Sequence, residues 1–199
     1  PGAGRAAPSR TAAPPPAPLA ARMRPRTLAD FVGQKHILGP SQLLRRAIEA
    51  DRIQSLIFFG PPGSGKTSLA QVIAQQTRSR FVRLSGVESN VSDIRRELAA
   101  AAYRRSNTAQ STILFIDEIH RFNKAQQDVL LPDVENGTVR LIGATTHNPF
   151  FFVNSPLVSR SQVFELQPLL EAELEEIMQR SLADPDRGLG RMRVRVDDA

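Results

Sequence analysis

Residues 58–71 of the chain read FFGPPGSGKTSLAQ, and this stretch decides the fold. An apolar run stops at Gly60, two prolines and two further glycines follow, and a helical pattern begins at Lys66 and Thr67. Glycines allow the backbone to curl so that successive N–H groups face an anion, and the helix that follows adds its positive N-terminal end. The stretch fits GxxxxGK(S/T) between an apolar run and a helix, so it predicts a phosphate-binding loop.

We expect this loop to bind ATP together with Mg²⁺. In such loops the lysine, here Lys66, reaches the β- and γ-phosphates, and the hydroxyl of the next residue, Thr67, is a ligand for the metal ion. The residues of the loop that we predict to bind the nucleotide are Gly60, Pro61, Pro62, Gly63, Ser64, Gly65, Lys66, Thr67 and Ser68.

Two acidic residues follow the apolar run TILFI at residues 112–116. Acidic side chains are costly at the end of a buried strand unless something uses them, although a strand end at the surface would leave them solvated. Beside a phosphate-binding loop, we expect Asp117 to hold the Mg²⁺ ion and nucleotide, and Glu118 to orient and deprotonate an attacking water. Adjacent Asp and Glu favour hydrolysis over transfer to a second substrate.

Two further segments supply candidate catalytic residues. In LIGATTHNPF (141–150), Thr146 is placed to touch the γ-phosphate or the attacking water, with Asn148 as the alternative and a plain turn as the structural explanation. In SPLVSR (155–160), Arg160 is either a solvated surface residue or an arginine finger that supplies positive charge to phosphoryl transfer. It precedes the last strand and lies far from its own phosphate-binding loop, so we expect it to act on a neighbouring subunit's nucleotide.

The composition is that of an ordinary globular protein, with 41% hydrophobic and 23% charged residues. No apolar run approaches the roughly 20 residues needed to span a bilayer, so we predict no membrane association. There is no cysteine, which excludes disulfides and thiolate metal sites, and the three histidines are scattered. Five of the six net positive charges come from arginines in residues 1–26, so the remainder of the chain is nearly neutral and its bulk charge does not identify a partner.

Apolar runs alternate with helical patterns after residue 27. Short strands joined by helical crossovers require a parallel sheet that is covered on both faces. We predict strands at 55–59, 80–84, 112–116, 138–145 and 162–166, and helices at 27–33, 41–52, 66–76, 92–105 and 171–183. We expect Ser41 to cap the second of these helices.

The predicted fold class is therefore α/β, a P-loop NTPase with a parallel five-stranded sheet flanked by helices. Residues 1–24 are rich in proline, alanine and arginine and are expected to be a disordered tail. Residues 25–168 form the predicted nucleotide-binding core, and 169–199 the start of a helical lid. We expect the chain to be a piece of a longer protein.

The motifs, taken together and in this order, resemble those of AAA+ ATPases. RPRTLADFVGQKHIL, GPPGSGKT, TILFIDEIHRFNKAQQD, GTVRLIGATTHNP and SPLVSR are similar to the replication-associated recombination protein A family, whose eukaryotic counterpart is the Werner-helicase-interacting protein. The resemblance covers residues 24–199, and HRFNKAQQD is its most discriminating segment. It implies a clamp-loader-like ATPase that acts at stalled or gapped replication forks, in replication-associated recombination and repair.

The resemblance also implies partners and roles. Such proteins bind single-stranded DNA ends, forks and gaps, hydrolyse ATP in a DNA-stimulated way, form homo-oligomers that are typically tetramers, and interact with single-strand-binding protein. By resemblance, Asp117 and Glu118 form Walker B, Thr146 is sensor 1, Arg160 is the finger that acts in trans, and Phe31 to Gln34 pack near adenine or form plain core. The expected location is the cytoplasm, at the nucleoid, or the nucleus of a eukaryote.

The chain departs from the family pattern in two respects. The run Phe150–Phe152 is bulkier than the usual NPSF; packing within the core is the favoured interpretation of the run, with a subunit contact or stacking on a DNA base as alternatives. The later part of the lid, with sensor 2, and the oligomerisation region would lie beyond residue 199. His120 and Arg121 either contact DNA or cap a turn.

Other functions remain open at this point. A P-loop phosphotransferase fits less well, because Glu118 and Arg160 have no place in it. A nucleotide-dependent assembly module would bind ATP without depending on its hydrolysis. Within the AAA+ class, a clamp-loader subunit or a branch-migration motor is the alternative, and HRFNKAQQD speaks against both.

Overall fold

The computed structural model describes residues 17–192 and 194. The chain divides into two compact units, one of residues 25–178 and the other of residues 1–24 with 179–199. The first unit holds the sheet and every candidate site residue. The predicted divisions after residues 24 and 168 stay predictions, and residues 1–16 of the expected tail lie outside the described residues.

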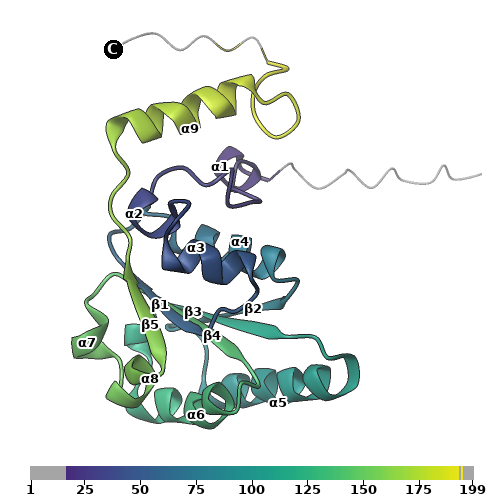
Figure 1. Cartoon of the computed structure of the whole chain (residues 1–199), viewed down its shortest axis with the longest axis vertical. Helices are drawn as coiled ribbons and strands as arrows, with labels where there is room; N and C mark the ends of the chain where they lie inside the picture. Colours follow the sequence, from purple (N-terminus) through teal and green to yellow (C-terminus); the bar gives the residue numbers. More distant parts are fainter. Residues whose placement is uncertain (1–16, 193, 195–199) are drawn as a thin grey trace, which may run out of the picture. The chain divides into compact units, whose positions relative to one another are not determined.

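A five-stranded parallel sheet forms the centre of the larger unit (Figure 1). Its strands lie in the order β2-β3-β4-β1-β5. Their bounds are β1 Ser55–Phe59, β2 Arg80–Ser85, β3 Thr112–Asp117, β4 Arg140–Thr145 and β5 Ser161–Glu165. The predicted fold class is confirmed, and each predicted strand is present to within two residues.

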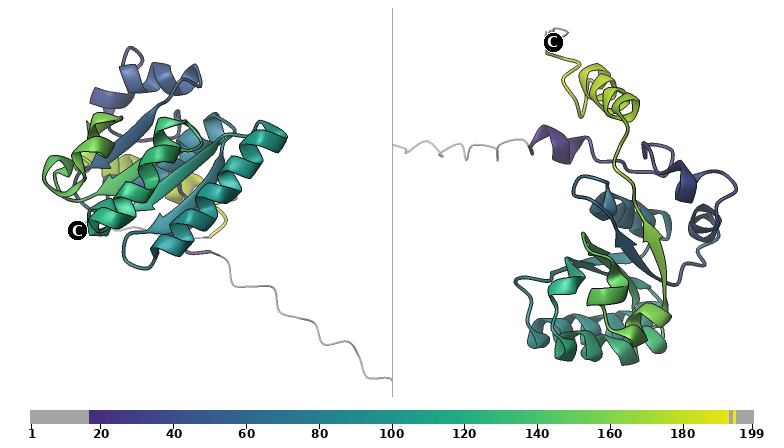
Figure 2. Two further views of the ribbon diagram at one scale, coloured as in Figure 1. Left: turned by 90° about the horizontal axis from the view of Figure 1, so that it is seen from below. Right: turned by 90° about the vertical axis from the view of Figure 1, so that its left-hand side faces the viewer.

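Helices cover both faces of the sheet (Figure 2). On one face α2 (Lys35–Leu38), α3 (Leu43–Glu49) and α4 (Lys66–Gln76) bury their apolar side chains against the sheet. The other face is covered by α5 (Val91–Thr108), α6 (Lys124–Glu135) and α8 (Ser155–Ser159). Neighbouring residues along the strands alternate between these two cores, as Leu56 and Ile57 do, because successive side chains of a strand point to opposite faces.

Two predictions about the first helices are wrong. Residues 28–30 form a turn and residues 31–33 are not helical. The Thr27 hydroxyl accepts from the Asp30 amide and the Asp30 carboxylate accepts from the Arg26 amide, which competes with helical pairing in so short a segment. Ser41 does not cap α3. The Gln42 amide donates to the Gly39 carbonyl, so that Ser41 lies inside a turn and Gln42 takes the cap position.

Several short helices were not predicted. One is α6, which starts with a capping box in which Asn123 and Gln126 each bond the other's backbone amide. The sequence pattern NKAQ carries this signal, but Pro132 inside the helix obscures its length. The 3₁₀ turn η1 (Ile119–Arg121) and α7 (Pro149–Phe152) were also missed, and both follow strands that end beside the phosphate-binding loop.

The smaller unit contains α1 (Leu19–Arg22), a single helical turn within the segment that we expected to lack structure. Helix α9 (Glu171–Ala183) begins in the larger unit and ends in the smaller one, and none of its residues is buried. Its bounds match the predicted helix. Among the described residues, no helix is both long enough and apolar enough to cross a membrane.

Candidate nucleotide-binding site

The phosphate-binding loop, residues 60–67, connects β1 to α4. Its three glycines Gly60, Gly63 and Gly65 have φ angles of 147°, 79° and 95°, which side-chain-bearing residues rarely adopt. A Cβ atom on Gly60 would lie 2.1 Å from the Leu166 carbonyl oxygen, and one on Gly65 would lie 2.8 Å from the Phe31 ring. The backbone at Leu166 and the ring of Phe31 therefore leave no room for a side chain at Gly60 and Gly65, and the φ angles favour glycine at all three positions.

Lys66 is the first residue of α4 and is buried, with 9% of its surface exposed. Its Nζ donates hydrogen bonds of 2.8 Å to the carbonyl oxygens of Gly60 and Pro61. Burial lowers the pKa of Lys66, and the carboxylates of Glu118 and Asp117 oppose this effect. The ammonium group therefore lies within electrostatic reach of both acids that the sequence singled out.

The loop also contains a buried polar atom that no group in the described part of the chain satisfies, the Oγ of Ser64. A buried hydroxyl without a partner is costly unless a ligand completes it. Behind it, the amides of Lys66, Thr67 and Ser68 are first-turn donors of α4, which have no partner within the helix. These donors, the Ser64 hydroxyl and the Lys66 ammonium fit the oxygens of a bound phosphate chain.

Asp117 and Glu118 lie at the same edge of the sheet as the loop, because the parallel strands β1 and β3 both end there. Asp117 Oδ2 pairs with Arg83 on β2 at 2.6 Å, a contact that the sequence did not suggest. Glu118 has a φ of 55°, in the left-handed region. A Cβ on Gly86 would lie 2.2 Å from the Glu118 carbonyl oxygen, so the tight turn at the acids depends on a glycine from the β2 side.

A fully buried threonine from β4, Thr145, reaches the same edge. The Nδ1 atom of His120 lies 2.9 Å from Thr145 Oγ1 and 3.2 Å from Glu118 Oε2. The sequence-based candidate Thr146 is the next residue, half-buried and without a side-chain hydrogen bond among residues 17–192. The His120 side chain is largely buried and contacts Thr145 and Glu118, and its contact with Glu118 was not foreseen.

The segment after β4 is more exposed than expected. Asn148 Oδ1 accepts from the Phe150 amide and so caps α7. Phe150, Phe151 and Phe152 are 65%, 81% and 49% exposed, so the favoured interpretation of core packing is wrong. The physical reason is that α7 is a single turn whose buried residue is Pro149, which leaves the three rings on the outside.

Arg160 is not part of this cluster. It directly precedes β5, whose first residue Ser161 is paired with Ser55 at the start of β1. The loop follows the other end of β1, and five strand residues at ~3.3 Å each separate the two by about 16 Å. Within its own subunit, the Arg160 side chain pairs with Glu135 at 2.7 Å.

The FVGQ segment lies against the phosphate-binding loop. Phe31 is the ring that backs Gly65. Gln34 has a φ of 56° and is 4% exposed, and its side-chain amide bonds the Ser64 carbonyl oxygen and both the carbonyl oxygen and the amide of Gln167. One buried amide thus joins three segments that are far apart in the sequence around the loop.

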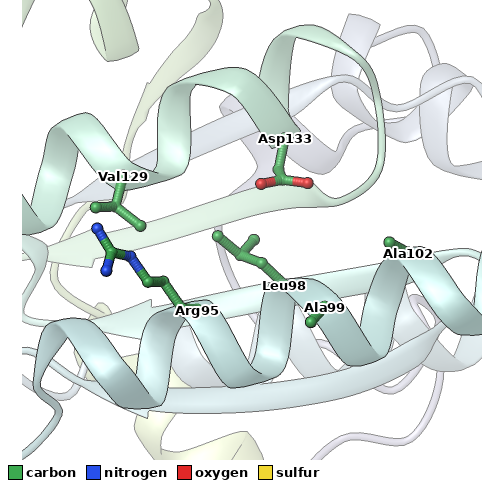
Figure 3. A pocket seen from close by; sticks show the side chains of 6 residues that line it. All are labelled: Arg95, Leu98, Ala99, Ala102, Val129 and Asp133. Atoms are coloured by element: carbon green, nitrogen blue, oxygen red, sulfur yellow. The ribbon is translucent and has the colours of Figure 1, made fainter.

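A separate hollow lies between α5 and α6 (Figure 3). Its lining residues are Arg95, Leu98, Ala99, Ala102, Val129 and Asp133. The hollow contains none of the loop residues and neither of the acids at the strand ends. The phosphate-binding loop and the acids at the strand ends therefore lie outside this hollow. Separately, no cluster of three or more His, Cys, Asp or Glu side chains among the described residues could hold a metal ion.

The chain is similar in sequence to several curated proteins. Replication-associated recombination protein A of Escherichia coli strain K12 is 49% identical over 173 residues, which are 87% of this chain and 38% of that protein. The ATPase WRNIP1 of Dictyostelium discoideum is 45% identical over 166 residues, 83% of this chain and 19% of that protein. The chain therefore spans less than half of the length of these curated relatives.

The fold and its sequence pattern have matches as well. The structure of the Thermotoga maritima RuvB Holliday junction branch migration motor superposes with a TM-score of 0.64 at 32% identity, covering 81% of this chain and 54% of that one. A family model described as the Holliday junction DNA helicase RuvB P-loop domain matches residues 23–147. The chain thus belongs to the RuvB P-loop family of AAA+ domains and is homologous to replication-associated recombination protein A and WRNIP1.

Proposed function

We propose that this chain is the ATP-hydrolysing AAA+ part of a protein that acts on DNA at stalled or gapped replication forks. The observation that carries the proposal is the cluster at one edge of the sheet, where the glycine-rich loop with the buried Lys66 follows β1 and the acids Asp117 and Glu118 end β3. The names of the homologous proteins supply the connection to replication-associated recombination.

The residues of the loop hold the nucleotide. The backbone amides at the start of α4, the Ser64 hydroxyl and Lys66 bind the phosphates, and Thr67 with Asp117 holds Mg²⁺. When bound, the metal ion neutralises charge on the phosphate oxygens. Because Asp117 pairs with Arg83 through Oδ2, its other oxygen, Oδ1, would remain to help hold the metal ion.

Glu118 is the general base of the proposed hydrolysis. It accepts the proton of the water whose oxygen attacks the γ-phosphorus, and the bond between the γ-phosphorus and the bridging oxygen of ADP breaks. Thr146 is proposed as the sensor that touches the γ-phosphate or this water. The products are ADP and phosphate, so no second substrate is required.

Arg160 is proposed to act on the nucleotide of a neighbouring subunit. The separation from its own loop supports this role, since an arginine finger must reach the transferring phosphoryl group. A homo-oligomer follows, and we propose a tetramer. To reach a neighbouring subunit's nucleotide, Arg160 must break its ion pair with Glu135. Both side chains are exposed, and exposed ion pairs contribute little to stability.

The DNA contact is proposed at the exposed rings of Phe150, Phe151 and Phe152, near the strand ends. Gln127 holds this segment next to η1, because its amide bonds the carbonyl oxygens of both Phe122 and Phe152. Aromatic rings stack on single-stranded bases without sequence preference, while Arg121, which is exposed, is available to a phosphate. Single-stranded ends, forks and gaps are the proposed ligands.

Single-strand-binding protein is the proposed protein partner, by homology. The proposed location is the cytoplasm at the nucleoid, or the nucleus if the source is eukaryotic.

Steady-state ATP hydrolysis by the full-length protein, with and without forked or gapped DNA, tests the proposal. We expect stimulation by DNA in the wild type and its loss in both Glu118→Gln and Arg160→Ala. Turnover that is indifferent to DNA would contradict the coupling to DNA, and turnover unaffected by Arg160→Ala would contradict the finger.

A branch-migration motor is the second candidate, because the superposed Thermotoga maritima protein is titled as one. The two functions differ in their DNA: a motor of that kind should move a four-way junction in an ATP-dependent way. Stimulation by gapped forks without junction migration would favour the first function. A clamp-loader subunit or a P-loop phosphotransferase has no comparable observation in its favour.

A further inference from the structure

Glu118 does not lie on relaxed backbone. Its φ of 55° and ψ of 49° are left-handed, a conformation that residues with a side chain rarely adopt. The turn is fixed by the Arg121 amide, which donates to the Glu118 carbonyl oxygen at 2.9 Å, and by the close approach of Gly86. The backbone thus sets the direction of the Glu118 side chain, and the contacts of that side chain determine the positions of its carboxylate oxygens.

The side-chain contact is made by His120. Its Nδ1 lies 3.2 Å from Glu118 Oε2 and 2.9 Å from Thr145 Oγ1. A nitrogen lone pair facing a carboxylate would be repelled, so the short approach of Glu118 favours the tautomer with the proton on Nδ1. The hydrogen bond of Nδ1 is to Thr145 Oγ1, and Glu118 Oε2 lies beside it at ion-pair distance. Burial lowers the pKa of His120, and the carboxylate of Glu118 opposes this effect.

Two aromatic side chains pack against the ring of His120. The His147 ring meets it edge-on at 4.4 Å between centroids, and the Phe152 ring lies at 6.2 Å. Its side chain is 10% exposed. The amide of His147 also donates to Thr145 Oγ1 at 3.0 Å, so the same hydroxyl oxygen receives both groups and ties the end of β4 to the histidine.

We infer that His120 is a positioning residue for Glu118: its Nδ1–H is anchored on Thr145 Oγ1 and attracts Oε2 from 3.2 Å, so that Oε1 is left to accept the proton of the attacking water. This inference rests on the proposed function, because it requires that Glu118 is the base. It also assigns Thr145, rather than its neighbour Thr146, to the connection between β4 and the base.

Substitution of His120 in the full-length protein tests the inference. His120→Leu removes Nδ1–H and keeps an apolar side chain in the buried place, whereas the side-chain amide of His120→Asn can replace Nδ1–H. We expect kcat for ATP hydrolysis to fall by about tenfold or more in His120→Leu while KM stays within about twofold, and to recover to within about fivefold of wild type in His120→Asn. His36→Leu, at an exposed histidine on α2, is the matched control and should leave kcat within about twofold.

The outcomes separate this inference from the proposed function. A wild-type protein without ATPase activity would contradict the proposed function itself. An active wild type with an unchanged kcat in His120→Leu, or with equal losses in the leucine and asparagine variants, would overturn the positioning role, as would a rise in KM alone. If the leucine variant does not fold, the asparagine variant decides: kcat about tenfold or more below wild type would overturn the inference, and kcat within about fivefold would support it.

Discussion

Ser64 has a buried hydroxyl that a bound ligand would complete. Its Oγ is buried and lacks a hydrogen-bond partner within the described residues. We expect Ser64→Ala to leave the free energy of unfolding unchanged or to raise it by about 1 kcal/mol without nucleotide, since an unsatisfied polar atom disappears. The same change should weaken ATP binding by roughly tenfold, the worth of one hydrogen bond to a charged group.

Urea denaturation and isothermal titration calorimetry measure the two effects. Ser92→Ala is the control, because Ser92 is exposed in the first turn of α5 and remote from the loop in sequence. Destabilisation of Ser64→Ala without nucleotide would show that the hydroxyl has a partner in the folded protein itself.

Gly86 is the second residue whose identity is set by a neighbour. An added Cβ would lie 2.2 Å from the carbonyl oxygen of Glu118 and 2.9 Å from that of Asp117. We expect Gly86→Ala to destabilise the protein by roughly 2–3 kcal/mol and to lower ATPase activity, since the backbone at both acids must move.

The matched change is Gly137→Ala, at an exposed turn where φ is 66° and the nearest side-chain atom is 3.8 Å away. It should cost about 1 kcal/mol, from the backbone conformation alone, and leave activity intact. Equal thermal shifts and equal activities in the two variants would argue against crowding at Gly86.

At the scale of elements, α6 and α7 are joined through one buried side chain. Gln127 is 2% exposed; its amide donates to the carbonyl oxygens of Phe122 and Phe152, and its Oε1 accepts from the Asn154 amide at 2.7 Å. We expect Gln127→Leu to lower the free energy of unfolding by roughly 2–4 kcal/mol, because three backbone groups lose their partner.

Chemical denaturation checks this expectation against Gln76→Leu. Gln76 is exposed at the end of α4, so its substitution should stay within about 0.5 kcal/mol. A loss below about 1 kcal/mol in Gln127→Leu would mean that water replaces the amide.

The elements also show what the sequence could predict. All five strands and the helices α4 and α5 were foreseen, because apolar periodicity reports directly on burial against a sheet. The helix α9 was foreseen from its periodicity as well, although none of its residues is buried. The short helices α2, α7 and η1 were missed, since each is a single turn whose formation depends on tertiary contacts. In the same way, the phosphate-binding loop and the acids at the strand end could be predicted, because each has a recognisable sequence pattern. The contacts of Arg83 with Asp117 and of His120 with Glu118 could not be predicted, because they depend on strand order and on side-chain direction.

At the scale of the whole molecule, the position of Arg160 makes a prediction about mixed oligomers. If Arg160 completes a neighbour's site, a full-length Lys66→Ala subunit can lend its arginine to an Arg160→Ala subunit whose loop is intact. In equal mixtures, random assembly should restore about a quarter of the sites, so ATPase activity should exceed the sum of the two separate proteins. Each variant alone should be inactive.

The control mixture replaces Lys66→Ala with the double variant that also carries Arg160→Ala, which has no arginine to lend. An activity of the first mixture no higher than that of the control would place the role of Arg160 within its own subunit, for example at its pair with Glu135.

The amide of Gln34 has a practical consequence for anyone who trims this protein. It bonds the backbone at Ser64 and Gln167, so the smallest piece that can keep an intact loop must extend from before residue 34 to beyond residue 167. A shortened protein that begins at Ser55 would keep the first strand of the sheet. It would nevertheless lack Gln34, whose side-chain amide supports the loop. Limited proteolysis within residues 17–24, ahead of Phe31 and Gln34, should be harmless, whereas a cut directly after Gln34 should release nucleotide.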